Sequence, residues 1–353
     1  MKDSKKTLRD KLQIILITYN RRKYLARTFE QIFAENSPVR DFDITVLDNC
    51  STDGTSELIE EYRGRFPHLK HIRHNRNIGG NANICRAFEM ASREYLWVLC
   101  DDDSYDWSNW VEIQEALMSY RFDMVYVCTL IARQLKKEIP QLLFLASFVP
   151  GVIYRTSSIT DTVMFNMYGC INTWFPQSVL SIGILVNNQG GYFIPKKDII
   201  IRKTEEDMSG GVLLRGSHHE YIHPDLDRIF WHIGYMKVLK IVKDLRKRRD
   251  LSVKVRFNER FDKSSVSYLR SILEYNRIYK KFNVDNIYEM ILAVPLIFKF
   301  YILFYIIGTF FKTCLFMNLR NIRGNTWPEE IFSLKKDKSG KKMFTILGMR
   351  WEF

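Results

Sequence analysis

Short apolar segments alternate with amphipathic helical segments from residue 12 to residue 127. Such apolar runs are typical of strands buried on both faces, and helices between them let successive strands run parallel. The pattern predicts strands at 13–18, 43–48, around 71, 95–100 and 124–127. It predicts helices at 22–34, 55–66, 78–92 and 107–119. We therefore expect an α/β domain with a mainly parallel central sheet flanked by helices, an architecture that suits nucleotide binding.

The rest of the chain is less regular, and its composition suggests two further regions. Residues 129–220 are expected to complete the sheet and to form a second pocket, with a helix at 176–186, a turn at 187–191, a strand at 192–201 and a mobile loop at 203–220. Residues 221–353 are expected to be helical, with a basic stretch at 236–256 and an apolar helix within 287–317. The predicted divisions are thus 1–128, 129–220 and 221–353.

Charge and cysteine usage limit the partners and the compartment. The 353 residues include 53 Lys and Arg against 40 Asp and Glu, a net charge of +13. This excess indicates an anionic partner, either a nucleotide, a nucleic acid or an anionic membrane. The six cysteines form no C-x-x-C pair, which favours reduced thiols in a cytosolic chain over a disulfide framework or a zinc site.

Three consecutive aspartates, Asp101 to Asp103, follow the apolar segment 95–100. If the chain stays extended, the side chains of Asp101 and Asp103 point the same way and can hold one hard dication such as Mg²⁺ or Mn²⁺. Such an ion would neutralise the charge of a diphosphate leaving group. Alternatively, the three carboxylates only open the helix that follows, where anions are favoured.

Two further motifs lie where predicted strands end. Thr18-Tyr19-Asn20 follows the first strand, and Asp48 begins the polar sequence Asp48 to Thr55 after the second. The carboxyl ends of parallel strands form the ligand crevice of an open sheet. The Asp48 carboxylate can accept a hydrogen bond from the ring N–H of uracil or thymine. The alternatives are an ordinary turn at 18–20 and simple capping of the next helix by Ser51, Thr52 and Asp53.

Several familiar nucleotide motifs are absent from the sequence. Neither Gly-x-Gly-x-x-Gly nor Gly-Lys-Ser/Thr occurs at a strand end, which argues against a dehydrogenase and against a P-loop enzyme. The segment from Asn75 to Asn83 instead carries Asn77-Ile78-Gly79-Gly80, whose glycines allow close approach of the backbone to a ligand, although a plain turn has the same signature.

Taken together and in this order, the motifs resemble those of an inverting family 2 glycosyltransferase with the GT-A fold. The resemblance covers residues 12–110 and rests on Thr-Tyr-Asn, Asp-Asn-x-Ser-Thr-Asp-Gly-Thr, Asn-x-Gly-Gly and Asp-x-Asp after a strand. The sequence of residues 94–103 is most similar to that of the abequosyltransferase-like members that build bacterial surface polysaccharides.

The resemblance implies a metal-dependent transfer of a sugar from a nucleoside diphosphate, with UDP favoured, to a glycan or lipid-linked glycan hydroxyl. Asp101 and Asp103 would ligate Mn²⁺ or Mg²⁺, and Asp48 would read the base. The implied nucleotide-binding residues are Thr18, Tyr19, Asn20, Asp48, Asn77, Gly79, Asn83, Asp101 and Asp102.

The catalytic base is the gap in the resemblance. Related families place a carboxylate at the start of the helix before a Gly-Tyr strand, whereas here Gly191-Tyr192 is preceded by Thr173 to Gln177 without one. An inverting transfer needs a base within reach of the acceptor hydroxyl. The candidates are Asp161, Glu205, Glu206 and Asp207, the last three of which can also be a solvated acidic loop. The basic residues of the same loop are candidates to close over the diphosphate: Arg202, Lys203, Arg215, His218 and His219.

The C-terminal third suggests membrane attachment. Residues 290–311 are nearly all apolar or aromatic but contain Lys299, which costs about 3 kcal/mol at a bilayer centre. We expect a helix in the cytoplasmic interface, with the basic stretch drawn to anionic lipid. The alternatives are a spanning helix and a helix that is buried in the protein or pairs subunits in a homo-oligomer. The expected location is cytoplasmic, peripheral to the inner face of the cell membrane.

The rival hypothesis is a protein without turnover that keeps the fold as a membrane or nucleic-acid-associated scaffold. Basic grooves with stacking aromatics bind single strands, and the C-terminal third has both residue types. The acidic run at 101–103 argues against a nucleic-acid track, so we expect no nucleic-acid partner.

Overall fold

The computed structural model describes residues 7–128, 138–173, 175–186, 190–201, 234, 238–243, 332–336, 342–346 and 349–352. The chain divides into two compact units, Met1–Arg256 and Phe257–Phe353, and each is considered by itself. The predicted divisions after residues 128 and 220 both fall inside the first unit and remain predictions.

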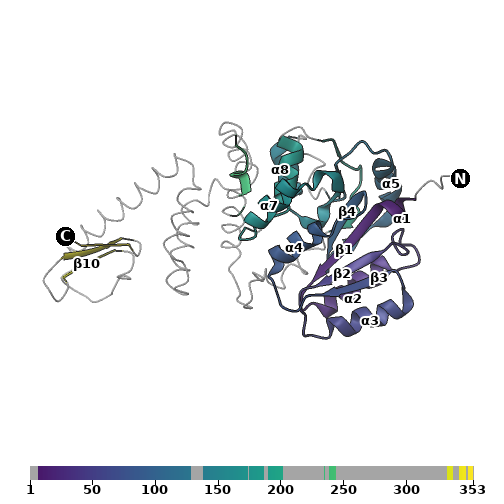
Figure 1. Ribbon diagram of the computed structural model, residues 1–353, viewed down its shortest axis with the longest axis horizontal. Helices are drawn as coiled ribbons and strands as arrows, with labels where there is room; N and C mark the ends of the chain where they lie inside the picture. The colour runs from purple at the N-terminus through teal and green to yellow at the C-terminus, as the bar shows by residue number, and fades with distance from the viewer. Residues whose placement is uncertain are drawn as a thin grey trace, which may run out of the picture. The chain divides into compact units, whose positions relative to one another are not determined.

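A seven-stranded sheet forms the centre of the first unit, in the order β3-β2-β1-β4-β7-β6-β8 (Figure 1). Neighbouring strands run parallel except where β7 pairs with β4 and β6. The strands are β1 (Leu12–Thr18), β2 (Ile44–Asp48), β3 (Leu69–Arg73), β4 (Tyr95–Cys100), β6 (Met124–Tyr126), β7 (Val152–Arg155) and β8 (Tyr192–Phe193). The predicted mainly parallel sheet flanked by helices is confirmed.

Helices cover the sheet and bury apolar side chains against it. In α2, for example, Leu25, Phe29 and Ile32 recur at helical spacing and are fully buried. The α-helices are α1 (Leu8–Lys11), α2 (Arg22–Ile32), α3 (Thr55–Arg65), α4 (Gly80–Glu89), α5 (Trp110–Met118), α6 (Ile139–Leu145), α7 (Asp161–Gly169) and α8 (Ser178–Val186). The 3₁₀ helices are η1 (Trp107–Asn109), η2 (Val149–Gly151) and η3 (Thr156–Ser158).

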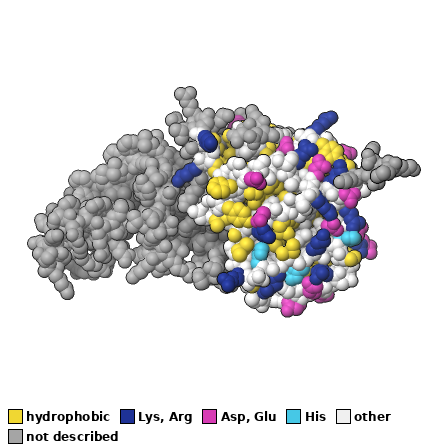
Figure 2. Space-filling view, viewed as in Figure 1, with side chains coloured by type: hydrophobic (Ala, Val, Ile, Leu, Met, Phe, Trp, Pro, Cys, Tyr) yellow, Lys and Arg dark blue, Asp and Glu magenta, His cyan; other side chains and the backbone are white. Residues whose placement is uncertain are grey.

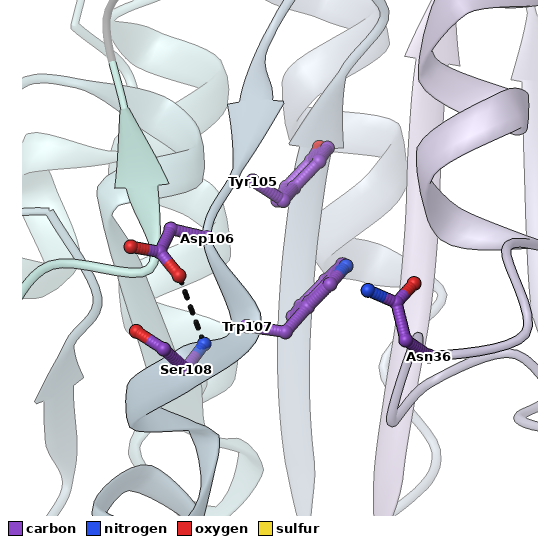
Figure 3. A pocket seen from close by; sticks show the side chains of 5 residues that line it. All are labelled: Asn36, Tyr105, Asp106, Trp107 and Ser108. Atoms are coloured by element: carbon purple, nitrogen blue, oxygen red, sulfur yellow. Dashed lines mark hydrogen bonds between the residues drawn. The ribbon is translucent and has the colours of Figure 1, made fainter.

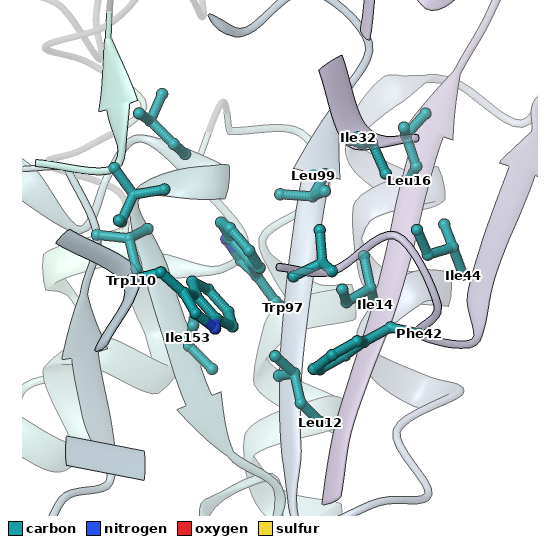
Figure 4. Close-up of a cluster of buried hydrophobic side chains, with 14 of the residues drawn as sticks. Leu12, Ile14, Leu16, Ile32, Phe42, Ile44, Trp97, Leu99, Trp110 and Ile153 are labelled. Atoms are coloured by element: carbon teal, nitrogen blue, oxygen red, sulfur yellow. The ribbon is translucent and has the colours of Figure 1, made fainter. Parts of the chain in front are cut away.

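Two hydrophobic clusters lie on opposite faces of the sheet. Ile14 and Leu16 of β1 belong to the cluster shown in Figure 4, together with Trp97, whereas Ile15 between them belongs to the other cluster. Successive side chains of a strand point to opposite faces. Both faces are therefore buried, which explains why these strands are continuous apolar runs in the sequence.

The sequence prediction of one strand at 192–201 is wrong. The structure has β8, then Ile194 to Ile199 outside any strand, and then β9 (Ile200–Ile201), which pairs antiparallel with β5 (Ser104–Tyr105). Pro195 lacks a backbone N–H, and Lys196, Lys197 and Asp198 are charged, so this segment does not suit a buried ladder.

The described residues of the second unit form a three-stranded antiparallel sheet of β10 (Phe332–Lys336), β11 (Lys342–Ile346) and β12 (Met349–Glu352). The sequence predicts helical structure throughout 221–353, so these strands differ from expectation. The apolar segment 287–317 and most of the basic stretch 236–256 lie outside the described residues. Where the structure does describe helices, none has both the length and the apolar character needed to span a bilayer.

Candidate functional site

The carboxyl ends of β2, β1 and β4 lie side by side and bring the strand-end motifs together. Thr18 of β1 is paired with Asp48 of β2, and Ile17 is paired with Cys100 of β4. This register places Asp101, the next residue, beside Thr18. Ligands of open parallel sheets bind at this edge, as the sequence analysis expected.

Asp101 is buried, with 2% of its surface exposed, and both of its carboxylate oxygens have partners. The Thr18 hydroxyl donates a hydrogen bond to Oδ2 at 2.7 Å, and Arg21 Nε lies 3.0 Å from Oδ1. Burial raises the pKa of Asp101 to about 7, although Arg21 and Thr18 act in the opposite direction. Asp101 is therefore held firmly by the loop that follows β1.

A second group forms next to Asp101. The Cys100 sulfur and carboxylate oxygens of Asp102 and Asp103 lie within 4.8 Å of one another. The chain leaves the extended conformation in a turn at Asp101 and Asp102, so the strand alternation assumed for Asp101 and Asp103 stops at Cys100. One sulfur and two carboxylates can hold a divalent metal. The residues present thus fit a metal ion, with a different ligand group from the predicted pair.

Arg21 links the two groups. Its Nη2 lies 2.6 Å from Asp102 Oδ2 while its Nε contacts Asp101, and its guanidinium stacks over Tyr24 at 4.2 Å. The backbone carbonyl of Asp103 accepts a hydrogen bond from Gln31 on α2 at 3.3 Å. Residues from the β1–α2 segment therefore position all three aspartates.

Asp48 is fully buried at the end of β2 and is surrounded by donors and cations. Its Oδ1 accepts from the Ser51 backbone at 2.9 Å, and its Oδ2 lies 3.4 Å from Arg73 Nε and 3.7 Å from His71 Nε2. Burial alone would raise the pKa of Asp48, but His71 and Ser51 outweigh it and lower that pKa. Asp48 is thus an ionised acceptor.

Asn20 joins two of the strand-end loops. It adopts a left-handed conformation with φ of 50°, which Asn tolerates better than most residues. Its backbone N–H donates to the Ser51 hydroxyl at 2.8 Å, and its side-chain oxygen accepts from the Thr52 backbone at 2.7 Å. The adjacent Tyr19 is 37% exposed, so its ring is available to a ligand.

The Asn-x-Gly-Gly motif is tied to the same edge by Asn49. The Asn49 side chain donates to Asn77 Oδ1 at 2.8 Å and accepts from the Ile78 backbone at 2.9 Å. Gly79 has φ of 87°, a conformation that side chains rarely adopt. Asn83 is buried and contacts His74 and the Leu47 carbonyl. Asn77 and Gly79 therefore lie at the site, while the contacts of Asn83 are internal to the fold.

Comparison with known families identifies the domain. Residues 13–176 match the family model described as Glycosyl transferase family 2. Residues 13–176 form a family 2 glycosyltransferase domain. The resemblance inferred from the motifs is confirmed, and so is the GT-A fold class of the first unit.

The similar proteins cover only part of the chain at useful identity. Abequosyltransferase RfbV of Salmonella typhimurium is 34% identical over 89 residues, which make up 25% of this chain and 26% of RfbV. Poly(ribitol-phosphate) beta-N-acetylglucosaminyltransferase TarS of Staphylococcus aureus is 31% identical over 96 residues, 26% of this chain and 16% of TarS. The chain thus spans about a quarter or less of these relatives.

Solved structures also resemble the chain. S. aureus TarS 1–349 in complex with UDP gives a TM-score of 0.48 at 17% identity and covers 81% of both chains. The mannosyltransferase PcManGT from Pyrobaculum calidifontis, in complex with GDP-Man and Mn²⁺, gives 0.46 at 11% identity and covers 80% of this chain and 85% of that one.

Of the candidate catalytic bases, the structure describes the position of Asp161 alone. Asp161 begins α7, shortly after Ser158, which contacts Asp123 ahead of β6. β7 runs antiparallel to β4, and its last residue, Arg155, pairs with Tyr95, the first residue of β4. The helix α7 therefore begins near the amino ends of the parallel strands, at the opposite end of the sheet from the site. This position does not favour Asp161 as the base. Glu205, Glu206 and Asp207 lie outside the described residues, as do Arg202, Lys203, Arg215, His218 and His219.

A pocket of about 420 Å³ flanks η1 (Figure 3). Its walls include Tyr105 and Trp107, whose rings stack at 5.0 Å, and none of the nucleotide-binding candidates lines it. Asp106 at its rim is ion-paired with Lys197, which together with Ser108 lowers the pKa of Asp106 to about 2.

Sequence reasoning assigned no role to four residues of the site in the glycosyltransferase domain. They are Arg21, Asn49, Arg73 and Cys100. Arg21 and Asn49 directly follow residues that were singled out, and Cys100 immediately precedes the aspartates. Their positions at or next to the ends of predicted strands were the sequence signal that could have identified them.

Proposed function

We propose that this protein moves a sugar from a nucleoside-diphosphate sugar, with UDP favoured, to a hydroxyl of a glycan or lipid-linked glycan, with inversion, during synthesis of a bacterial surface polysaccharide. The observation that carries the proposal is the convergence of Thr18, Asp48 and Asp101 at the carboxyl edge of three parallel strands. The family 2 domain supports sugar transfer. Relatives named as an abequosyltransferase and an N-acetylglucosaminyltransferase support a surface glycan.

In this proposal the Asp48 carboxylate accepts a hydrogen bond from the ring N–H of uracil. His71 and Arg73 favour the ionised carboxylate, which is the form that accepts hydrogen bonds. Because Asp48 is fully buried, uracil can reach it only if side chains around it shift, and Arg73, with 41% of its side chain exposed, is more exposed than the other cationic partner, His71. Tyr19 is available to stack on the base or ribose.

A divalent ion, Mn²⁺ or Mg²⁺, belongs to the proposal. Asp103 would hold it, with Asp101 as the resemblance implies or with Asp102 as the structure groups them. When bound, such an ion neutralises charge that develops on the diphosphate leaving group. Arg21, which already contacts two of the aspartates, supplies a fixed positive charge at the same place.

The remaining parts of the proposal concern the setting of the reaction. We propose that the acceptor is presented at an anionic membrane surface, that the protein is cytoplasmic and peripheral to the inner face of the cell membrane, and that homo-oligomers form through C-terminal helices. The observations in favour are the basic stretch at 236–256 and the apolar segment at 287–317. With Asp161 disfavoured by its position, we propose the catalytic base among Glu205, Glu206 and Asp207.

The test is release of UDP from UDP-sugars by the full chain, with and without Mn²⁺ or Mg²⁺. We expect metal-dependent release that Asp103→Ala abolishes and that Glu115→Gln, an exposed change on α5, leaves intact. Absence of nucleotide binding by folded protein would contradict the proposal.

The rival without turnover predicts UDP binding and no release or transfer under any metal. On the face seen in Figure 2, Lys and Arg side chains are interspersed with Asp and Glu rather than gathered in one track. This distribution does not favour a nucleic-acid scaffold over a transferase.

A further inference from the structure

We propose that Cys100 supplies a sulfur ligand to the divalent cation of this site, so that the site binds thiophilic ions such as Cd²⁺ and Co²⁺ more tightly than Mg²⁺. The inference rests on the metal ion of the proposed function and adds a ligand type to it. In the part of the chain that the structure describes, Cys100, Asp102 and Asp103 are the one group of three such side chains close enough to share an ion.

The geometry of the three donor atoms supports a shared ion. Two donors on one ion lie at most about 4.5 Å apart, roughly twice a metal–ligand bond of about 2.2 Å. The sulfur and the two carboxylate oxygens already lie within 4.8 Å of one another. A shift of a few tenths of an ångström, within the reach of carboxylates on a turn, therefore completes the arrangement.

The fold fixes the sulfur and places the two carboxylates beside it. Cys100 is the last residue of β4, and its backbone is held by parallel pairing with Ile17 of β1. Asp102 and Asp103 lie in and just after the turn that follows. Both carboxylate oxygens of Asp101 are engaged by Thr18 and Arg21, whereas Arg21 contacts Asp102 through Oδ2, so the Asp102 carboxylate would be shared between Arg21 and the ion.

Ligand chemistry then sets the metal preference. Thiolate ligands favour thiophilic ions, whereas carboxylates alone suit Mg²⁺ and Mn²⁺. As the metal–sulfur bond forms, the thiol proton passes to solvent and the sulfur binds as thiolate. A mixed set of one sulfur and two carboxylates is therefore expected to bind Cd²⁺ and Co²⁺ tightly while still accepting Mn²⁺.

The experiment adds Cd²⁺ or Co²⁺ to the full chain, kept reduced, and records sulfur-to-metal charge-transfer absorption together with calorimetric affinity. Cys100→Ser should remove the band and weaken Cd²⁺ binding by about tenfold or more, while Mg²⁺ affinity stays within about twofold. The matched control is Cys50→Ser, another partly exposed cysteine, which should keep both the band and the affinity.

A second variant keeps the test decisive if Cys100→Ser folds poorly. Asp102→Asn should weaken Cd²⁺ and Mg²⁺ alike and leave the charge-transfer band present at saturating Cd²⁺. A band that survives in Cys100→Ser, or that is missing from the wild type, would overturn the inference. UDP release with Mg²⁺ is measured in parallel, so that failure of the transferase proposal is seen separately from failure of sulfur ligation.

Discussion

The charges around Asp48 make stability depend on pH through His71. The His71 ring lies 3.7 Å from the Asp48 carboxylate and 3.2 Å from that of Glu60, and these two carboxylates, Asp48 foremost, raise the pKa of His71 although burial acts in the opposite direction. Because the pKa of His71 is higher in the folded state, protonated His71 stabilises the fold, and this stabilisation is fully present below the unfolded-state pKa of about 6.5. The stabilisation is lost as the pH rises through the folded-state pKa.

We therefore predict that His71→Gln flattens the pH dependence of unfolding above pH about 6.5, where the wild type loses the stability that protonated His71 contributes. The lowered pKa of Asp48 acts at the acidic end, because its contribution is lost only as pH falls through that pKa. Urea unfolding midpoints measured across the pH range report both the loss of the His71 contribution at high pH and the loss of the Asp48 contribution at low pH. Parallel curves for wild type and variant would contradict the role given to His71.

Gly79 and Gly80 offer a matched pair at the turn before α4. Gly79 has φ of 87° and ψ of 151°, a region open essentially to glycine alone, whereas Gly80 is the first residue of the helix, and a Cβ at either position meets nothing within 4 Å. Gly79→Ala should therefore destabilise the domain by about 1–3 kcal/mol, and Gly80→Ala should leave it unchanged or slightly stabilised. Chemical denaturation compares the two variants. Equal losses of stability would show that the backbone conformation of Gly79 is not the reason for its effect.

Residues of the site could be predicted from the sequence where strand topology alone brings them together. Thr18, Asp48 and Asp101 each follow or end an apolar run, so parallel pairing is enough to gather them. The group of Cys100, Asp102 and Asp103 could not be predicted, because the strand alternation that pointed to Asp101 and Asp103 ends at the turn. The role of Arg21 depends on side-chain direction, which spacing does not reveal.

At the scale of elements, β4 has the bounds that the sequence predicts, and it also anchors the neighbouring segments. The fully buried Trp97 donates from Nε1 to the Pro150 carbonyl at 2.8 Å, which ties η2 and β7 to β4. Trp97 stacks on Trp110 at 6.1 Å within the cluster of Figure 4. Elements such as α6 and β7 were not predicted, because this region lacks the regular alternation of residues 12–127.

We predict that Trp97→Phe lowers the free energy of unfolding by about 1–3 kcal/mol, because a buried carbonyl loses its donor. Trp107→Phe is the control, since Trp107 is only partly buried at the pocket of Figure 3, and it should cost less than about 1 kcal/mol. Equilibrium urea unfolding measures both variants. A larger effect at Trp107 would mean that η1, and not the link between β4 and η2, limits stability.

For the whole molecule, the two hydrophobic clusters determine where the chain can be divided. Among the residues that the structure describes, the members of both clusters lie between Leu8 and Val242, and Val238, Leu239 and Val242 are buried in the same cluster as α8. The first unit ends at Arg256, beyond these residues.

A chain that ends at Arg256 should therefore keep its thermal unfolding midpoint and its UDP affinity, because it retains both clusters. A second truncation, after Lys237, removes Val238, Leu239 and Val242 and should lower the midpoint. Differential scanning calorimetry and UDP titration of both fragments test this, and loss of cooperative unfolding in the longer fragment would show that the first unit depends on residues 257–353.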